Sequence, residues 1–417
     1  MSDSTARAWR PSLPFNELAL LVAILVVVLI TAAVDSNHSY LRDPYTSVRD
    51  IARNVALLGI FALGAAVVII AGGIDLSSGS MIAFSSTICA STMMLLAPQT
   101  MMNMQPVGPL VAAAGIIAAI CSGFLVGSLH AWLITSVRLP PFVATLATLV
   151  GLRSFARAYC GYITAKTLGG SGNTEINVYD PYFKFMRDEV WIVFVPTFLV
   201  LAVFTFILLN HTVLGRHIYA LGGNEQAARL SGIRTESVKW FAYCFSAITA
   251  SIAGVFYMAD QSVASPVNQG VGYELNAIAA AVVGGCSLQG GIGTVPGVIF
   301  GVIFLRVVID SVAKLIKSGS DIYEGMIVGI VVVIAVTFSQ LRQIRASGGE
   351  LFPGKLGWFA IPTLSAMIGL LTAMATANMP YLKGRDIWIG AAAGIAALVA
   401  LGAVKLLEFQ RQRRSEA

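Results

Sequence analysis

The chain has 417 residues, of which 57% are hydrophobic and only 12% are charged. Soluble domains carry about a quarter charged residues, so this composition excludes an ordinary soluble protein and indicates an integral membrane protein. The net charge of +6 comes from Lys and Arg in tails and loops beside apolar runs. Topology and lipid headgroups explain these charges better than nucleic acid does.

Apolar runs long enough to cross about 30 Å of hydrocarbon recur along nearly the whole chain, which predicts an all-α, polytopic membrane bundle. Lys and Arg are slightly more frequent in the even-numbered loops, so both termini are expected in the cytoplasm. We place about twelve spans. They are expected at 17–35, 51–71, 79–97, 108–137, 141–159, 190–210, 238–260, 274–289, 294–316, 322–340, 358–378 and 386–407.

The stretch GGIDLSSGS, Gly72 to Ser80, interrupts apolar sequence between the second and third spans. Its Asp75 is unusual, because a charge in hydrocarbon must meet water, a partner or a substrate. Two compatible interpretations stay open. Asp75 caps the following helix through N–H groups near Ser77 and Ser78, or it contacts a substrate or a gate.

The fifth span is entered through two prolines and carries Thr145 and Thr148, hydroxyls that usually bond to their own helix or to a neighbour. Arg153 and Arg157 lie one helical turn apart near the predicted outer end. Snorkelling to the headgroups is the favoured interpretation for both arginines, and contact with a ligand hydroxyl or carboxylate is the alternative.

Two long loops are predicted on opposite sides of the membrane. The loop 161–189 is polar, turn-rich and expected outside. The loop 211–239 is expected in the cytoplasm and contains a helical stretch, NEQAARLSGI. Asn224 is its expected N-cap and Gly232 its expected C-terminal stop.

The eighth span, ELNAIAAAVVGGCSLQ, is short and rich in small residues. Its glycine break echoes the one near residue 72, and short glycine-interrupted segments in two parts of a chain point to a transport pathway. Glu274 is expected at the N-terminal end of this helix, where the dipole favours it. Asp310 and Lys314, four residues apart, are expected to form a local ion pair.

The chain lacks the motifs of common enzymes. There is no GxxxxGK[ST] phosphate loop, no HExxH and no GxSxG, and five isolated cysteines suggest neither a metal site nor a disulfide framework. We therefore predict no catalytic residue, no metal and no enzymatic activity on this chain.

Taken together, four stretches resemble the permease subunits of bacterial ABC sugar importers of the ribose/xylose/arabinose/galactose type. The resemblance covers about residues 50 to 340 and implies a ten-helix permease domain over 1–340. After it, a C-terminal extension over 341–417 adds two predicted spans and a basic tail. The stretches are GGIDLSSGSMIAFSS at 72–86, LPPFVATLATLVGLRSFA at 139–156, LGGNEQAARLSGI at 221–233 and GYELNAIAAAVVGGCSLQGGIGTVPGVIFGV at 272–302.

The resemblance implies a multi-pass subunit of the bacterial cytoplasmic (inner) membrane that imports a monosaccharide or a related small polyol. Its implied partners are a second permease copy, a cytoplasmic ATPase that carries ATP and Mg²⁺, and a periplasmic or extracellular sugar-binding protein. Neither a cofactor on this chain nor nucleic acid is expected. Family members commonly have Asp where this chain has Asn276, Thr at Cys286 and a small residue at Gln289, so the sugar itself is not predicted.

Two other functions stay open beside the importer. One is an ion-coupled secondary carrier with Asp75 or Asp310 as its proton-coupling carboxylate, and the other is a membrane enzyme or scaffold.

Two groups of functional residues follow from the motifs and the resemblance. The pathway or substrate candidates are Asp75, Ser77, Ser80, Phe142, Thr145, Thr148, Asn276 and Gln289. The candidates for contact with the ATPase are Gly222, Gly223, Asn224, Ala228, Arg229 and Gly232.

Overall fold

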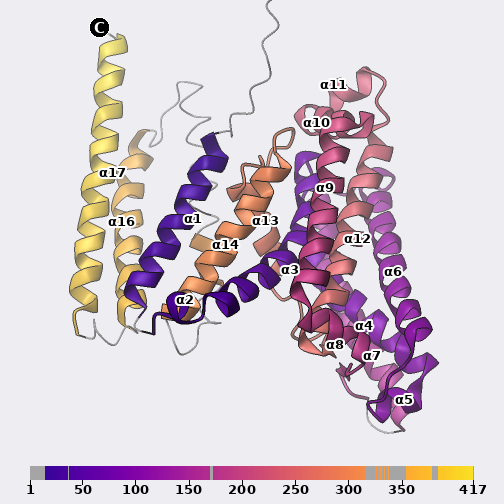
Figure 1. Cartoon of the computed structure of the whole chain (residues 1–417). Coiled ribbons are helices and arrows are strands. Elements are labelled where there is room, and N and C mark those ends of the chain that lie inside the picture. The colour runs from indigo at the N-terminus through magenta and orange to yellow at the C-terminus, as the bar shows by residue number, and fades with distance from the viewer. Residues whose placement is uncertain are drawn as a thin grey trace, which may run out of the picture. The chain divides into compact units, whose positions relative to one another are not determined.

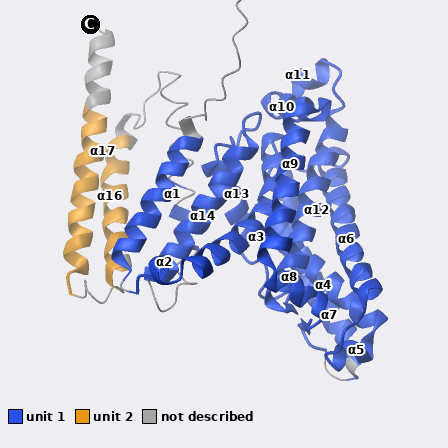
Figure 2. Cartoon of the chain, in the orientation of Figure 1, with its two compact units in different colours: residues 1–315, 321–335 blue, residues 316–320, 336–417 orange. Residues whose placement is uncertain are grey.

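The protein was analysed as a computed structural model, which describes residues 15–35, 37–169, 172–315, 354–377 and 384–416 and several positions between 325 and 337. Figure 2 shows that the chain divides into two units. Unit 1 comprises residues 1–315 and 321–335, and unit 2 comprises 316–320 and 336–417. The predicted domain boundary at residue 340 lies outside the described residues and stays a prediction.

Unit 1 is a bundle of helices with one two-stranded sheet (Figure 1). The sheet pairs β1 with β2 antiparallel, so that Ile176 faces Ala264. The elements in chain order are α1 (Phe15–Val34), α2 (Ser39–Arg42), α3 (Pro44–Ile70), α4 (Ser78–Leu96), α5 (Pro98–Met102), α6 (Pro109–Thr135), α7 (Pro141–Leu168), β1 (Ile176–Asn177), α8 (Pro181–Asp188), the π-helix η1 (Val190–Phe194), α9 (Val195–His211), α10 (Val213–Gly223), α11 (Glu225–Leu230), α12 (Thr235–Gln261), β2 (Val263–Ala264), α13 (Tyr273–Val283) and α14 (Val295–Leu315).

The prediction of an all-α, polytopic membrane protein is confirmed. Nine helices in the described part of the chain are long and apolar enough to cross a bilayer. Two expectations were wrong in extent: α7 continues to Leu168, inside the loop predicted to begin at 161, and α13 has only 11 residues. The predicted span 322–340 lies mostly outside the described residues, so the count of ten core helices stays a prediction.

Local sequence signals set several helix ends. Asp43 accepts a hydrogen bond from the Thr46 N–H (3.1 Å) and Pro44 occupies the first turn of α3, where its missing N–H is harmless. Asn224 caps α11 by accepting from the Ala227 N–H (3.0 Å), and Gly232 has a φ of 84° after its end. Both expectations for NEQAARLSGI are therefore confirmed.

The core of unit 1 is built around α3 and α12. The second half of α3 is buried almost without interruption and packs on α9, α12, α13 and α14, whereas α12 packs on α3, α4 and α6. Glycines permit the closest approaches, because without a hydrophobic drive between helices in lipid, small residues are what bring backbones together. Gly127 of α6, for example, rests directly on the backbone of Cys244 in α12.

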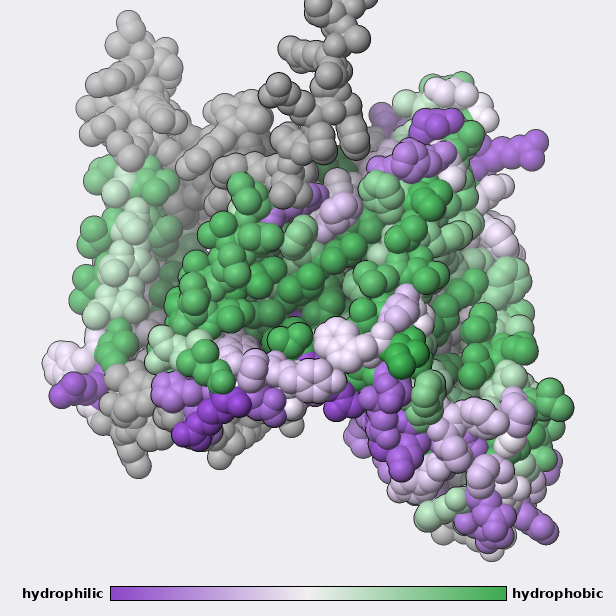
Figure 3. Space-filling model, viewed as in Figure 1, coloured by the Kyte–Doolittle hydropathy of each residue, from purple (hydrophilic) through white to green (hydrophobic). Residues whose placement is uncertain are grey.

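The two ends of unit 1 differ in the elements they carry. α10 and α11 precede α12 and lie at one end, which we call the α10 end, and the β1–β2 sheet and α8 lie at the opposite sheet end (Figure 1). Figure 3 shows hydrophilic residues gathered over α8 and α2 and, at the other end, over α10 and α11, with apolar surface between. The two long loops thus occupy opposite ends of α12, as the sequence predicted.

The chain between β2 and α14 crosses unit 1 in an unusual way. β2 belongs to the sheet end, whereas Gly290 and Gly291 lie beside Gly222 at the α10 end. The only helix between them, α13, measures about 16 Å and is too short to cross a bilayer. The crossing therefore combines non-helical backbone, from Ser265 to Gly272, with a half-helix.

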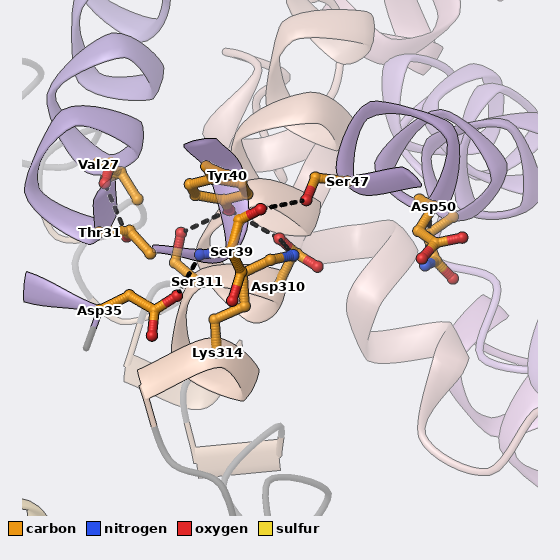
Figure 4. A network of polar contacts seen from close by, with 11 residues as sticks. Val27, Thr31, Asp35, Ser39, Tyr40, Ser47, Asp50, Asp310, Ser311 and Lys314 are labelled. Carbon is orange, nitrogen blue, oxygen red and sulfur yellow. Dashed lines mark hydrogen bonds and ion pairs between the residues drawn. The ribbon is translucent and has the colours of Figure 1, made fainter. Parts of the chain in front are cut away.

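A polar network ties α1, α2 and α14 together (Figure 4). Asp35, after α1, accepts a hydrogen bond from the Ser39 N–H (2.8 Å) at the start of α2. Tyr40 of α2 donates to Asp310 Oδ2 on α14 (2.7 Å), and Lys314 donates to the same oxygen (2.7 Å) while lying 4.6 Å above the Tyr40 ring. The expected ion pair between Asp310 and Lys314 is confirmed, and it belongs to a larger cross-link.

Unit 2 contains α16 (Gly354–Ala377) and α17 (Asp386–Glu416), which pack on each other as a helical hairpin. Gly369 of α16 meets the backbone of Gly390 and Gly394 of α17, a small-residue contact of the kind that joins helices in membranes.

The approach of α6 to α12 gives a first prediction. A Cβ at Gly127 would lie 2.5 Å from the Cα of Cys244, where only backbone could yield. We expect Gly127→Ala to lower the unfolding free energy in detergent by about 1–3 kcal/mol, from overpacking. The control, Gly151→Ala, adds a Cβ with nothing within 4 Å. It should be neutral or stabilise by up to about 1 kcal/mol through helix propensity. Equal melting curves for the two variants would contradict the described helix contact.

Candidate functional site

The first break lies between Ile70, where α3 ends, and Ser78, where α4 begins. Asp75 is 2% exposed inside it. Its Oδ1 accepts hydrogen bonds from the Ser77 N–H (2.9 Å) and hydroxyl (2.6 Å), and its Oδ2 accepts one from the Ser246 hydroxyl of α12 (2.7 Å). Asp75 thus holds the turn before α4, whose N-cap residue is Ser77, and ties it to α12. The capping interpretation agrees in part, since the bond from the Ser77 N–H is present.

Hydroxyls of α4 and α7 surround the break. The Ser80 hydroxyl donates to the Ser77 carbonyl (2.8 Å) and lies 3.4 Å from the Thr148 carbonyl of α7. The Thr145 hydroxyl lies 3.3 Å from the Ile74 carbonyl and 3.0 Å from that of Pro141 in its own helix. Five of the predicted pathway residues, Asp75, Ser77, Ser80, Thr145 and Thr148, therefore form one polar cluster, which we call the Asp75 cluster.

Two residues of this region escaped the sequence analysis. His130 of α6 is fully buried, and its Nε2 lies 2.7 Å from the Thr148 hydroxyl. Its Nδ1 has no hydrogen-bond partner among the described residues. The His130 ring meets Tyr243 of α12 edge-on at 6.2 Å, and the Tyr243 hydroxyl lies against Gly73. An ionisable ring within the apolar run GSLHAWLIT was the signal available for His130.

The second break follows α13 and touches the first. Gly290 and Gly291 have φ angles of 88° and 73°, a region that favours glycine. The Gly291 N–H donates to the carbonyl of Ile70, the last residue of α3 (2.8 Å). A Cβ at Gly290 would lie 2.7 Å from the Cα of Gly72. The two glycine breaks that echo each other in sequence are thus in contact in space.

The C-terminal end of α10 completes this contact. A Cβ at Gly222 would collide with the Ile70 carbonyl and lie 2.5 Å from the Gly291 nitrogen. We call Gly72, Gly222, Gly290 and Gly291 the glycine junction. One turn earlier, the Tyr219 hydroxyl donates to the Gly293 carbonyl (2.8 Å), and burial raises the Tyr219 pKa, which keeps this donor protonated. α10 therefore contacts both breaks, through the backbone of Gly222 and through the Tyr219 hydroxyl.

α11 projects from the junction toward solvent. Lys239 pairs with Glu225 (2.6 Å) and Arg229 pairs with Glu236, and these exposed pairs contribute little stability. They border a cavity of about 380 Å³ between α11, the start of α12 and the turn after α6. Leu230 at the tip of α11 is 89% exposed. A large apolar side chain so exposed beside charged groups is suited to contact with another protein.

The three remaining pathway candidates differ in position and exposure. Phe142 is 51% exposed on the first turn of α7, Asn276 is buried on α13, and Gln289 is exposed beside the glycine junction. Of the predicted ATPase-contact residues, Ala228 is the buried residue of α11. Those that are exposed are Gly223, Asn224, Arg229 and Gly232.

Arg153 departs from the favoured expectation of snorkelling. Its Nη1 donates to the carbonyls of Pro266 (3.0 Å) and Gln269 (2.7 Å), and its Nη2 lies 3.4 Å from the Gly79 carbonyl. Arg157, one turn further, is exposed. Arg153 therefore binds protein backbone, and the two arginines differ in environment.

The arrangement defines a class of protein. Helix breaks that meet inside a membrane bundle, lined by hydroxyls and a buried carboxylate, are typical of transport proteins, in which unwound backbone borders the pathway. In the described part of the chain, no group of three or more His, Cys, Asp and Glu side chains could hold a metal ion.

Comparison with known families agrees with this class. The family model described as branched-chain amino acid transport system / permease component matches residues 47–336. The chain belongs to this family of permease components, and the predicted resemblance to importer permeases is confirmed.

Curated relatives carry import functions in their names. The ribose import permease protein RbsC of Escherichia coli (strain K12) is 33% identical over 328 residues, covering 78% of this chain and 93% of the relative. The galactose/methyl galactoside import permease protein MglC of the same strain is 29% identical over 291 residues (69% and 84%). The autoinducer 2 import system permease protein LsrC of Salmonella paratyphi B is 34% identical over 328 residues (78% and 85%). No solved structure matches the chain significantly.

Asp75 yields a second prediction. Asp75→Ala leaves the Ser77 and Ser246 donors without their acceptor, so we expect the unfolding free energy in detergent to fall by about 3 kcal/mol or more. Asp75→Asn keeps an acceptor for the Ser77 N–H and should lose about 1 kcal/mol. Thermal unfolding of the purified variants measures both. An Asp75→Ala protein as stable as wild type would show that these hydrogen bonds do not hold the break.

Proposed function

We propose that this chain is the permease subunit of an ATP-driven importer that moves a monosaccharide or a related small polyol across the bacterial cytoplasmic membrane. The import functions named for its relatives support this substrate class. The Asp75 cluster is compatible with it, because hydroxyls and backbone carbonyls can bind the hydroxyl groups of a small polar solute.

The observation that carries the proposal is the glycine junction. In an ATP-driven importer, force applied at one end of the bundle must change the pathway inside it. Here the end of α10 touches the end of α3 and the loop after α13 at backbone distance, without a side chain between them. A displacement of α10 and α11 therefore reaches both breaks directly.

The proposal includes the partners. A separate ATPase holds ATP and Mg²⁺ and docks on α11, where Leu230 is the apolar anchor and Arg229 lies beside it. This chain itself carries no cofactor. A second permease copy completes the pathway, and a binding protein delivers the solute at the sheet end. The α10 end and both termini then face the cytoplasm.

Reconstitution tests the proposal against an ion-coupled carrier. Proteoliposomes that contain this chain, its ATPase and its binding protein should accumulate labelled sugar only when ATP is supplied. Vesicles with the chain alone should show no uptake under an imposed pH gradient. Uptake by the chain alone would favour the carrier, although Asp75 and Asp310 are both held by protein donors. A sugar panel bound to the binding protein identifies the substrate.

A fourth prediction concerns transmission through the junction. Gly222→Ala places a Cβ against the Ile70 carbonyl, whereas the Cβ of Gly161→Ala, on α7, meets nothing within 4 Å. We expect Gly222→Ala to lower ATP-driven uptake by about ten-fold or more, since overpacking at this contact is worth more than about 1 kcal/mol. Gly161→Ala should keep uptake within about two-fold, a difference of about 0.4 kcal/mol. Equal uptake by the two variants, at equal amounts in the membrane, would contradict transmission at Gly222.

A further inference from the structure

The non-helical segment Ser265–Gly272 enters unit 1 from the sheet end and stops against α4. Gly270 and Gly272 have φ angles of 67° and 78°. The backbone of Gly270 touches that of Gly79, the residue before Ser80 of the Asp75 cluster. The segment therefore lies between the Asp75 cluster and the sheet end, and we call it the plug.

Gln269 holds the plug in shape from within. It is 1% exposed, and its Oε1 accepts hydrogen bonds from the Ser86 hydroxyl (2.8 Å) and the Ser265 N–H (3.2 Å). Its Nε2 donates to Gln261 Oε1 (2.9 Å) and to the Val263 carbonyl (2.7 Å). These bonds satisfy non-helical backbone and a side chain at membrane depth, as the lack of water there requires.

Arg153 fastens the plug to its surroundings. From α7 it reaches two plug carbonyls, those of Pro266 and Gln269, and the Gly79 carbonyl of α4. A single cation therefore joins α7, α4 and the plug. Loss of these charge-assisted bonds would release three elements at once.

Glu274, just after the plug, has a carboxylate oxygen without a hydrogen-bond donor in the described structure, whereas Arg153 reaches three carbonyls. The residue is 8% exposed, and its Oε2 has no hydrogen-bond partner in the described structure. The position that a Cβ of Gly79 would take lies against this same oxygen, so Glu274 and the Arg153 contacts share one neighbourhood. A buried carboxylate oxygen without a donor is costly, and a state in which a cation meets it regains that free energy.

We propose that the plug is the gate at the sheet end of the pathway and that Arg153 exchanges partners to work it. In the closed state, described here, Arg153 binds the carbonyls of Pro266, Gln269 and Gly79. In the open state it pairs with Glu274, while the glycines at 270 and 272 act as hinges. The inference rests on the proposed function, because it assigns the pathway's gate.

The test measures access to the Asp75 cluster in full-length protein in membrane vesicles. Ser80→Cys places a thiol behind the plug, in a chain whose exposed Cys121 is changed to Ser. A membrane-impermeant, cationic thiol reagent is applied to vesicles of both orientations. Arg153→Ala removes three carbonyl contacts from the closed state and one ion pair from the open state, so the expected change is the net of the two. We expect the modification rate from the sheet side to rise about ten-fold, which corresponds to a net loss of about 1.4 kcal/mol from the preference for the closed state. Arg157→Ala, an exposed arginine on the same helix, is the matched control and should leave the rate unchanged.

Glu274→Gln tests the exchange of partners. Without the carboxylate the open state loses its ion pair, so the introduced thiol should react more slowly than in the parent and ATP-driven uptake should fall. If Arg153→Ala fails to fold, Gln269→Ala is the second variant. It removes the side-chain bonds inside the plug, leaves the Arg153 side chain unchanged and should also raise the rate of thiol modification. Unchanged rates in a folded Arg153→Ala or Gln269→Ala protein would mean that the plug is a fixed part of the fold. Thiol modification requires no import. A modification rate that changes as expected in the variants, together with no ATP-driven uptake by the wild-type chain and its partners, would therefore contradict the proposed function and still support the gate.

Discussion

Non-helical backbone inside a membrane bundle must find its hydrogen-bond partners in protein, since hydrocarbon offers none. The described part of unit 1 contains three such stretches, at the first break, in the plug and after α13, and their polar groups bind one another or side chains of neighbouring helices. The Gly291 N–H binds the Ile70 carbonyl, Asp75 receives the donors of its own turn, and Arg153 covers the carbonyls of the plug. Because the backbone at each stretch must reach partners in protein, these stretches contain glycines, which allow close approach, and few charged residues.

The same requirement links the two ends of the bundle. The glycine junction at the α10 end and the plug at the sheet end lie on either side of the Asp75 cluster. α13 runs from the plug toward the junction, whereas α4 begins beside the plug at Gly79. Bonds between non-helical segments can be exchanged for equivalent bonds, whereas the hydrogen bonds inside α3 or α12 cannot. In the proposed mechanism, motion is therefore concentrated in the breaks, and α3 and α12 are the fixed frame.

Much of the architecture could be predicted from sequence because apolar length determines where a chain spans lipid. The ends of α4, α6 and α14 fall within two residues of the expected positions, and Asn224 and Gly232 end α11 as predicted. The start of α13, with Glu274 in its first turn, agrees with the prediction, but its early end and the plug could not be predicted, because hydropathy counts apolar residues and does not distinguish a half-helix from a full span. The partners of Arg153 could not be predicted either, because the sequence gives no signal for a bond to the backbone carbonyl of a distant residue. Asp75 and four other pathway candidates do form one cluster. Phe142 is exposed one turn before Thr145 on α7, Asn276 is buried on α13 and Gln289 lies beside the glycine junction.

The brevity of α13 has a consequence for how the protein is made. A helix of 11 residues that carries Glu274 and Asn276 is too short and too polar to partition into lipid when it leaves the ribosome. It can enter only as part of a larger piece, once α14 has emerged to cover it and α3 and α12 already stand in the bilayer. The order of synthesis thus places α3 and α12 before the plug and α13, and the crossing between β2 and α14 is completed after both.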